Sequence, residues 1–224
     1  MAVECVLFAH WPVDPDQLRP YVPDQLELDV RDGRAWVSIL PFTLADVRPR
    51  PLPKAFGRST PEVNLRTYVR YRDEPGLYFF SIDLGWRRIA AVTRRLTRLP
   101  CYGLDADVET DGGRTTVRSV RTDGPPAGFA ATYAPTGTAS RPEPGSLDEW
   151  LVERYRFYAP RGAGVLFGAI DHDPWPLQPA TATIHENDLL AAAGLPEPDG
   201  EPRVRHCDRL KMTGSVPRRL GTVG

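Results

Sequence analysis

The stretch EVNLRTYVRY at residues 62–71 carries the clearest strand signal in this 224-residue chain. Its side chains alternate in character, as expected of a β-strand whose successive residues point to opposite faces. One face would carry Val63, Leu65, Thr67 and Val69, and the other would carry Glu62, Asn64, Arg66, Tyr68 and Arg70. The polar face either meets solvent, with charge pairing between its residues, or lines the cavity of a β-barrel. The pattern alone leaves both interpretations open.

Strand patterns continue on both sides of this stretch. The residues LYFFSIDL at 77–84 follow a DEPG turn and predict a strand that pairs back. Ser81 and Asp83 share one of its faces and would extend the wall formed by the polar face of residues 62–71. Asp32-Gly33 stands between two apolar runs and predicts a tight hairpin turn. Further strands are predicted at 3–9, 103–110, 114–121, 128–135, 164–172, 180–185 and 203–212. Without strand–helix–strand alternation, the fold class is α+β and mainly antiparallel, a barrel or sandwich with peripheral helices.

Few helices are predicted, and all are short. One opens at Asp14-Pro15, one covers 86–97 with an apolar stripe at Ile89, Val92 and Leu96, and one covers NDLLAAAG at 187–194. Ser146 and Glu149 form a capping-box pattern that predicts the strongest helix, with an apolar stripe running as far as Tyr158. The proline-rich residues 48–61 predict a long ordered loop, such as the rim of a site.

Composition limits the classes of function. There are 28 basic and 29 acidic residues, so the net charge is −1, and no basic tract suits nucleic acid. The three cysteines are too few and too scattered for a disulfide framework. No apolar run approaches the roughly 20 residues that span a bilayer, and the N-terminus lacks a signal-peptide pattern. We therefore expect one cytoplasmic domain over residues 1–214, a C-terminal tail at 215–224 and no membrane partner. Open antiparallel edges make a homodimer plausible.

Common catalytic motifs are missing from the sequence. It has no glycine-rich dinucleotide or phosphate loop and no nucleophile elbow. Its four histidines have no metal-ligand spacing, so we expect neither a metal nor another cofactor. In the segment DHDPWP, His172 is either an acid or base at a cavity mouth or part of a rigid corner in which Trp175 packs into the core.

Five ordered blocks carry a resemblance to a known family. They are the segments HWPVDPDQLRPYVPDQLELDVRDGRAWVSILPF, PEVNLRTYV, PGLYFFSIDL, GSLDEWLVERYRFYAP and HDPWPLQPA. Together they resemble the uncharacterised YqjF-like family, which is related at superfamily level to acetoacetate decarboxylase. The resemblance covers nearly all of residues 5–210. It implies an antiparallel β-barrel or cone with a few peripheral helices and a central cavity.

The same resemblance gives meaning to the stretch RLPCY at residues 98–102. In acetoacetate decarboxylase, a helix ends at a Gly-Phe-Pro motif followed by two lysines, one of which forms a Schiff base with the keto substrate. Here Leu99-Pro100 is followed by Cys101 and Tyr102, so both amines are absent. A thiol or phenol cannot form the iminium that decarboxylation needs. The only lysines are Lys54 and Lys211, so we expect no imine-forming activity.

Three functions stay open at this stage. The first is a small-molecule-binding barrel without chemistry, whose ligand, such as a carboxylate or ketone, is bound by Asn64, Tyr68, Ser81, Cys101 and Tyr102. The second is an enzyme that acts on a keto acid or similar carbonyl compound, with Glu62 as acid or base and Arg66 as the anion anchor. The third is a scaffold with a filled barrel. Cys101 is more typical of a buried small hydrophobe than of a nucleophile.

Overall fold

The computed structural model describes residues 1–47, 57–162, 164–198, 200–215 and 217–219. Most of the predicted loop at 48–61 therefore lies outside the described residues. The strands are β1 (Ala2–Val13), β2 (Glu27–Leu28), β3 (Ala35–Val47), β4 (Arg58–Tyr71), β5 (Glu74–Leu84), β6 (Cys101–Asp111), β7 (Arg114–Arg121), β8 (Gly128–Pro135), β9 (Arg156–Arg161), β10 (Gly164–His172), β11 (Gln178–Asn187), β12 (Arg203–Gly214) and β13 (Arg218–Arg219). The helices are α1 (Pro15–Leu18), a 3-10 turn (Arg19–Tyr21), α2 (Arg87–Thr97), α3 (Leu147–Val152) and α4 (Leu189–Ala192).

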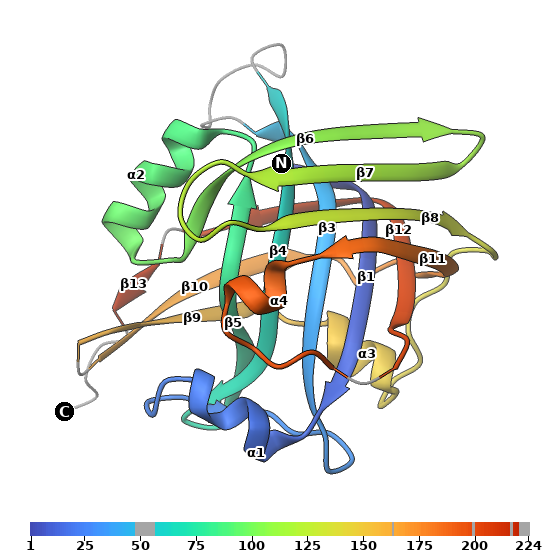
Figure 1. The fold of residues 1–224 in the computed structure, drawn as a ribbon. Helices are drawn as coiled ribbons and strands as arrows, with labels where there is room; N and C mark the ends of the chain where they lie inside the picture. The colour runs from blue at the N-terminus through green and yellow to red at the C-terminus, as the bar shows by residue number, and fades with distance from the viewer. Residues whose placement is uncertain (48–56, 163, 199, 216, 220–224) are drawn as a thin grey trace.

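The strands form one sheet that is mainly antiparallel, as predicted. Its order is β13-β10-β9-β5-β6-β7-β8-β11-β12-β1-β3-β4-β2, and β4 also pairs with β5 while β10 also pairs with β12. The two parallel pairings of the described strands both involve β5, which runs beside β9 at one end and beside β6 at the other. Figure 1 shows that β6, β7, β8 and β11 cross one side of the layer formed by β1, β3, β4 and β5.

Two hydrophobic cores lie on opposite faces of this central layer. One includes Leu65 of β4 and Phe129 of β8, and fills the space under the crossing strands. The other includes Tyr68 of β4, Phe79 of β5 and Phe157 of β9. Because both faces of β4 are covered, the solvent-facing interpretation of its polar residues is wrong.

A β-bulge in β5 changes the direction of its later side chains. Leu65 pairs with Ser81 and Arg66 with Phe79, so Phe80 is the extra residue. An extra residue reverses the alternation of side chains beyond it. Ser81 and Asp83 therefore do not join the wall formed by the polar face of β4, contrary to the prediction.

The helix α2 covers nearly its predicted range but presents the opposite face to the protein. The predicted apolar stripe is exposed, at 48%, 56% and 67% for Ile89, Val92 and Leu96. The side facing the sheet carries Ala90 and Arg94 instead. Arg94 fixes this orientation, because its guanidinium donates to the carbonyl of Cys101 at 2.8 Å and to Asp123 at 2.8 Å.

The helix after Ser146 is much shorter than predicted. The hydroxyl of Ser146 accepts a hydrogen bond from the amide of Glu149, so the cap is present. The helix nevertheless ends at Val152. Residues 156–161 form β9 instead, because pairing with β10 and β5 satisfies their backbone groups. Tyr158 therefore lies on a strand and not on a helical stripe.

Part of the C-terminal segment joins the sheet. The amide of Ser215 donates to the carbonyl of Ala169, and β13 pairs with β10, so these residues of the predicted tail are ordered against β10.

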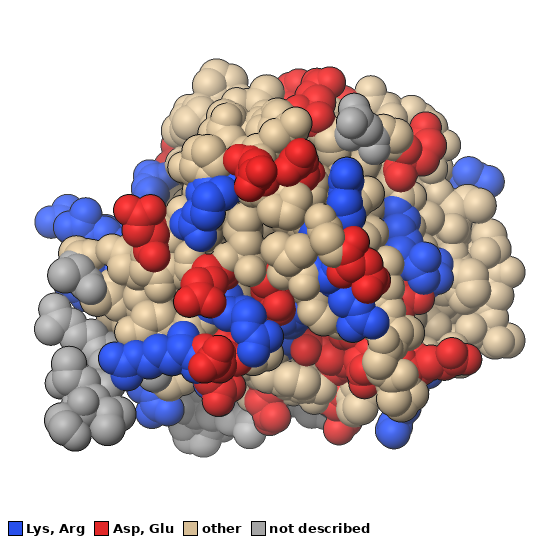
Figure 2. Space-filling view, turned by 90° about the horizontal axis from the view of Figure 1, so that it is seen from below, with Lys and Arg blue, Asp and Glu red and all other residues tan. Residues whose placement is uncertain are grey.

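Other features agree with the sequence analysis. The turn at Asp32-Gly33 forms as predicted, with positive φ at both residues. Figure 2 shows acidic and basic side chains interspersed on one face, consistent with the balanced composition. Among the described helices, none has the length and hydrophobicity of a membrane span.

A buried ion pair ties β5 to β7 and provides a test of the fold. Arg121 donates to both carboxylate oxygens of Asp83 at 2.9 and 3.0 Å, and both side chains are almost fully buried. We expect Asp83→Ala to lower the free energy of unfolding by about 3–5 kcal/mol, because it leaves a buried guanidinium unpaired. Urea denaturation measures this loss. The exposed Asp105→Ala on β6 serves as the control and should change stability by less than about 0.5 kcal/mol. Equal effects of the two variants would contradict the importance of the pair.

Candidate functional site

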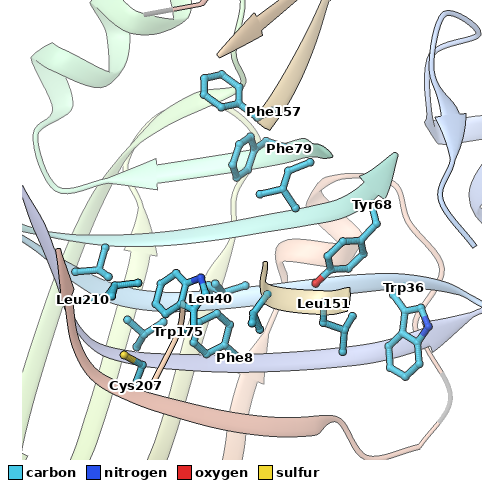
Figure 3. Close-up of a cluster of buried hydrophobic side chains, with 14 of the residues drawn as sticks. Phe8, Trp36, Leu40, Tyr68, Phe79, Leu151, Phe157, Trp175, Cys207 and Leu210 are labelled. Atoms are coloured by element: carbon cyan, nitrogen blue, oxygen red, sulfur yellow. The ribbon is translucent and has the colours of Figure 1, made fainter. Parts of the chain in front are cut away.

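A cavity of about 280 Å³ lies beside the polar face of β4. Its walls come mainly from the core that contains Tyr68, and Figure 3 shows part of that cluster. Phe79 contacts Phe157 edge-to-face, and Trp175 contacts Phe8 in the same way. The lining is predominantly apolar, with a small number of polar side chains, as is usual for sites that bind small molecules.

Three polar residues of β4 line this cavity in succession. They are Glu62, Asn64 and Arg66, which share one face because they are two residues apart along the strand. Asn64 and Arg66 are 3% and 7% exposed, so their polar groups are removed from bulk water. The structure thus brings together both predicted catalytic residues and two predicted ligand-binding residues, Asn64 and Cys101.

Glu62 is a cavity-lining carboxyl group whose pKa is shifted toward neutrality. Its carboxylate accepts a hydrogen bond from the amide nitrogen of Asn64 at 3.2 Å. Burial raises the pKa of Glu62 to about 7, against the smaller opposing effects of Asn64 and Arg66. At neutral pH both the acid and the carboxylate are populated, which suits a group that takes up and releases a proton.

Arg66 is a buried cation without a carboxylate partner. No ion pair to its guanidinium is present among the described residues, and its Nε has no hydrogen-bond partner there. Burial lowers its pKa, and neighbouring Tyr68 and Glu62 oppose that shift. Burying a charge without a carboxylate partner is costly.

Arg154 adds a second guanidinium to the cavity wall. Its Nη1 donates to Asp29 at 2.6 Å and its Nε donates to the carbonyl of Trp150 at 2.7 Å. The guanidinium also lies 4.3 Å from the centre of the Trp150 ring. Its Nη2 is buried and has no partner among the described residues. Arg154 is therefore held firmly in place with one donor left for a ligand.

Cys101 lines the cavity, but it is not poised as a nucleophile. Burial raises the pKa of its thiol to about 12, and the charge of Glu62 contributes in the same direction. Lys211 is exposed and borders an outer pocket beyond the cavity. Lys54 lies outside the described residues. Among the described residues that line the cavity, none carries a primary amine on its side chain.

The other predicted ligand-binding residues lie elsewhere. Tyr68 points into the core, where its hydroxyl and the side chain of His10 both bond to the hydroxyl of Ser38 at 2.7 Å. Ser81 and Tyr102 border a separate outer pocket, because the bulge in β5 and the alternation in β6 turn them away from Cys101. The Tyr102 ring instead lies against the guanidinium of Arg121, 4.3 Å from its centre.

Sequence reasoning missed Arg154 and left the role of the DHDPWP segment open. Arg154 was assigned to a long helix, so nothing marked it as a cavity residue. His172 and Trp175 both line the cavity, and Nε1 of Trp175 is buried without a partner among the described residues. His172 interacts with the carbonyl of Asp173 at 2.8 Å and stacks on Tyr155. The described residues contain no cluster of side chains suited to a metal ion.

Comparison with solved structures defines the class of fold. The enduracididine biosynthesis enzyme MppR complexed with pyruvate aligns with a TM-score of 0.65 at 13% identity, covering 100% of this chain and 90% of that one. An acetoacetate decarboxylase-like enzyme from Sphingomonas wittichii RW1 aligns with a TM-score of 0.60 at 13% identity, covering 99% and 92%. Acetoacetate decarboxylase from Legionella pneumophila gives 0.58 at 14% identity, covering 98% and 87%. The protein therefore has the acetoacetate decarboxylase-like fold, as the resemblance implied.

Comparison of sequences gives the particular family. The DUF2071 family, described as an uncharacterized conserved protein, matches residues 1–211. The chain is 42% identical over 205 residues to the uncharacterized protein YqjF of Bacillus subtilis (strain 168), covering 91% of this chain and 85% of that protein. The chain belongs to the DUF2071 family, which confirms the YqjF-like assignment.

The raised pKa of Glu62 predicts a pH-dependent effect of removing its charge. The native pKa of about 7 exceeds the ordinary value of 4.5, so the native state binds the extra proton between these values. The wild type therefore loses stability as pH rises through this window, and Glu62→Gln does not. We expect thermal melts to show the variant several degrees more stable than wild type at about pH 8, and similar to it at about pH 4.

The control for this measurement is Glu109→Gln, which changes an exposed glutamate on β6. Its melting temperature should track that of the wild type at every pH. A constant difference between Glu62→Gln and wild type across the pH range would mean that Glu62 titrates normally.

Proposed function

We propose that the protein binds a small organic acid in its cavity, with the ligand carboxylate held between Arg66 and Arg154. The observation that carries this proposal is the buried guanidinium of Arg66, which has no carboxylate partner and whose Nε has no hydrogen-bond partner among the described residues, in a predominantly apolar cavity. A carboxylate would accept hydrogen bonds from Nε of Arg66 and Nη2 of Arg154, which have no partner among the described residues. The pyruvate bound to the structural neighbour MppR is an acid of the same chemical class.

A second candidate function adds catalysis at the same place, with Glu62 as the acid or base. Its support is the raised pKa, which keeps a proton acceptor and a proton donor available near neutrality. Abstraction of a proton next to a carbonyl, hydration and dehydration need such a group, and the neighbouring guanidinium can stabilise negative charge that develops on the substrate.

Imine chemistry is not part of the proposal. A Schiff base needs a primary amine in contact with the substrate carbonyl, and the cavity-lining residue after the Leu99-Pro100 break is the thiol-bearing Cys101. The exposed position of Lys211 outside the cavity supports the same conclusion.

Replacing Arg66 tests the anion site. We expect Arg66→Gln to weaken the binding of small carboxylates by about ten- to a hundredfold, the usual loss when a charged hydrogen bond is removed. Isothermal titration calorimetry with pyruvate, acetoacetate, hexanoate and octanoate measures the change. Arg58→Gln alters an exposed arginine on the same strand and should leave every affinity unchanged. Equal affinities in the wild type and Arg66→Gln would overturn the proposed carboxylate site.

Borohydride trapping tests the absence of an imine. We expect that wild-type protein treated with acetoacetate or pyruvate and sodium borohydride acquires no adduct on a lysine, because no described side chain of the cavity lining carries a primary amine. Cys101→Lys places an amine in the apolar cavity, where burial lowers its pKa and favours attack on a ketone. This variant should acquire a reduced adduct at residue 101. A wild-type adduct on Lys54 or Lys211, found by peptide mass spectrometry, would contradict the proposal.

A further inference from the structure

The cavity is larger than a three-carbon acid requires. A cavity of about 150 Å³ in a protein core accommodates benzene, which has six non-hydrogen atoms. By that ratio, the 280 Å³ measured here corresponds to about 11 non-hydrogen atoms. A carboxylate group uses three of them, so about eight carbon atoms remain for the rest of the ligand.

The chemistry of the walls indicates what those carbon atoms must be. Beyond the polar stripe of β4, the lining consists mainly of branched and aromatic side chains such as Leu40, Phe42, Leu77, Ile82 and Phe157. An apolar surface gains free energy only by covering apolar atoms, so a hydroxylated or charged tail would be penalised. The apolar walls of the cavity therefore favour a ligand whose tail is a hydrocarbon.

The spacing along β4 fits a ligand of this length. Glu62 and Arg66 are four residues apart, which places their Cα atoms about 13 Å from each other on an extended strand. A ligand with its carboxylate at Arg66 and a tail of several carbon atoms can lie along the strand past Glu62. A three-carbon acid leaves most of the apolar lining uncovered.

Phe79 lies at the end of the cavity where the carboxylate is proposed to bind, because it pairs with Arg66 across β5 and β4. Phe79 and Leu99 line the cavity and also a neighbouring outer pocket that contains Tyr78, Ser81 and Tyr158. This boundary lies where β5 changes its parallel partner from β9, at residues 77–78, to β6, at residues 82–84. Backbone pairing of β5 with β9 and β6 does not separate the cavity from the outer pocket at this point, so side chains separate them. Phe79, which is 8% exposed, is the largest of these side chains.

From these observations we infer that the ligand is a medium-length carboxylate with an unbranched or phenyl-bearing hydrocarbon tail. This inference rests on the proposed carboxylate site and adds the class of acid that fills it. The volume and the apolar walls support it independently of the role of Glu62.

A chain-length series tests the inference. Calorimetry with acetate, pyruvate, hexanoate, octanoate, decanoate, tetradecanoate and 3-phenylpropanoate gives an affinity for each acid. We expect affinity to rise about fourfold per methylene up to octanoate or decanoate, the increment for burying one methylene, and then to fall. 3-Phenylpropanoate should match octanoate, and pyruvate should bind at least tenfold more weakly than either.

The outcomes separate this inference from the proposed function. If affinity does not depend on chain length, or if pyruvate binds best, the inferred class of tail is overturned. The carboxylate site still stands in either case, provided that Arg66→Gln weakens binding. If the wild type and Arg66→Gln bind every acid with the same affinity, both proposals are overturned.

Discussion

The burial of both faces of β4 is the constraint on which the site depends. One face packs under the crossing strands, so it must be apolar, and the other face closes one wall of the cavity. The polar residues on that second face cannot turn toward solvent without exposing Leu65 and its neighbours. The hydrophobic core therefore holds Glu62 and Arg66 in the cavity against their own preference for water.

This arrangement has an energetic cost that fold stability alone does not explain. A leucine or methionine in place of Arg66 would fit an apolar wall without any desolvation penalty. The buried pair Asp83–Arg121 shows how the same protein treats an arginine with a structural role, because it gives that guanidinium two carboxylate oxygens. Arg66 receives none from the described residues. Strained or unsatisfied groups of this kind are characteristic of functional sites, where a ligand completes the interactions.

The sequence predicted the elements whose apolar and polar residues alternate regularly along the chain. It missed the features that are determined by packing against other strands and helices. The alternation at 62–71 identified β4 and the residues of its cavity face, and the order of the blocks identified the fold. The pattern could not show that Phe80 is a bulge, because a bulge is defined by its pairing with Leu65 and Arg66. It could not show that α2 exposes Leu96, since helical spacing gives the stripe but not the side that meets the sheet. Arg154 was missed because its position depends on a helix ending early.

Position 101 carries a thiol, so the amine that the resemblance to acetoacetate decarboxylase implies there is absent. With the thiol of Cys101 protonated well above neutrality, the group nearest to a useful pKa is Glu62 itself. The wall of β4 then holds the proposed proton-transfer group and one of the two proposed cations, and Arg154 supplies the other from the segment between α3 and β9. One strand supported on both faces by core packing and one arginine fixed by Asp29 thus provide the polar groups of the proposed site, and the apolar walls determine which ligands fit against them.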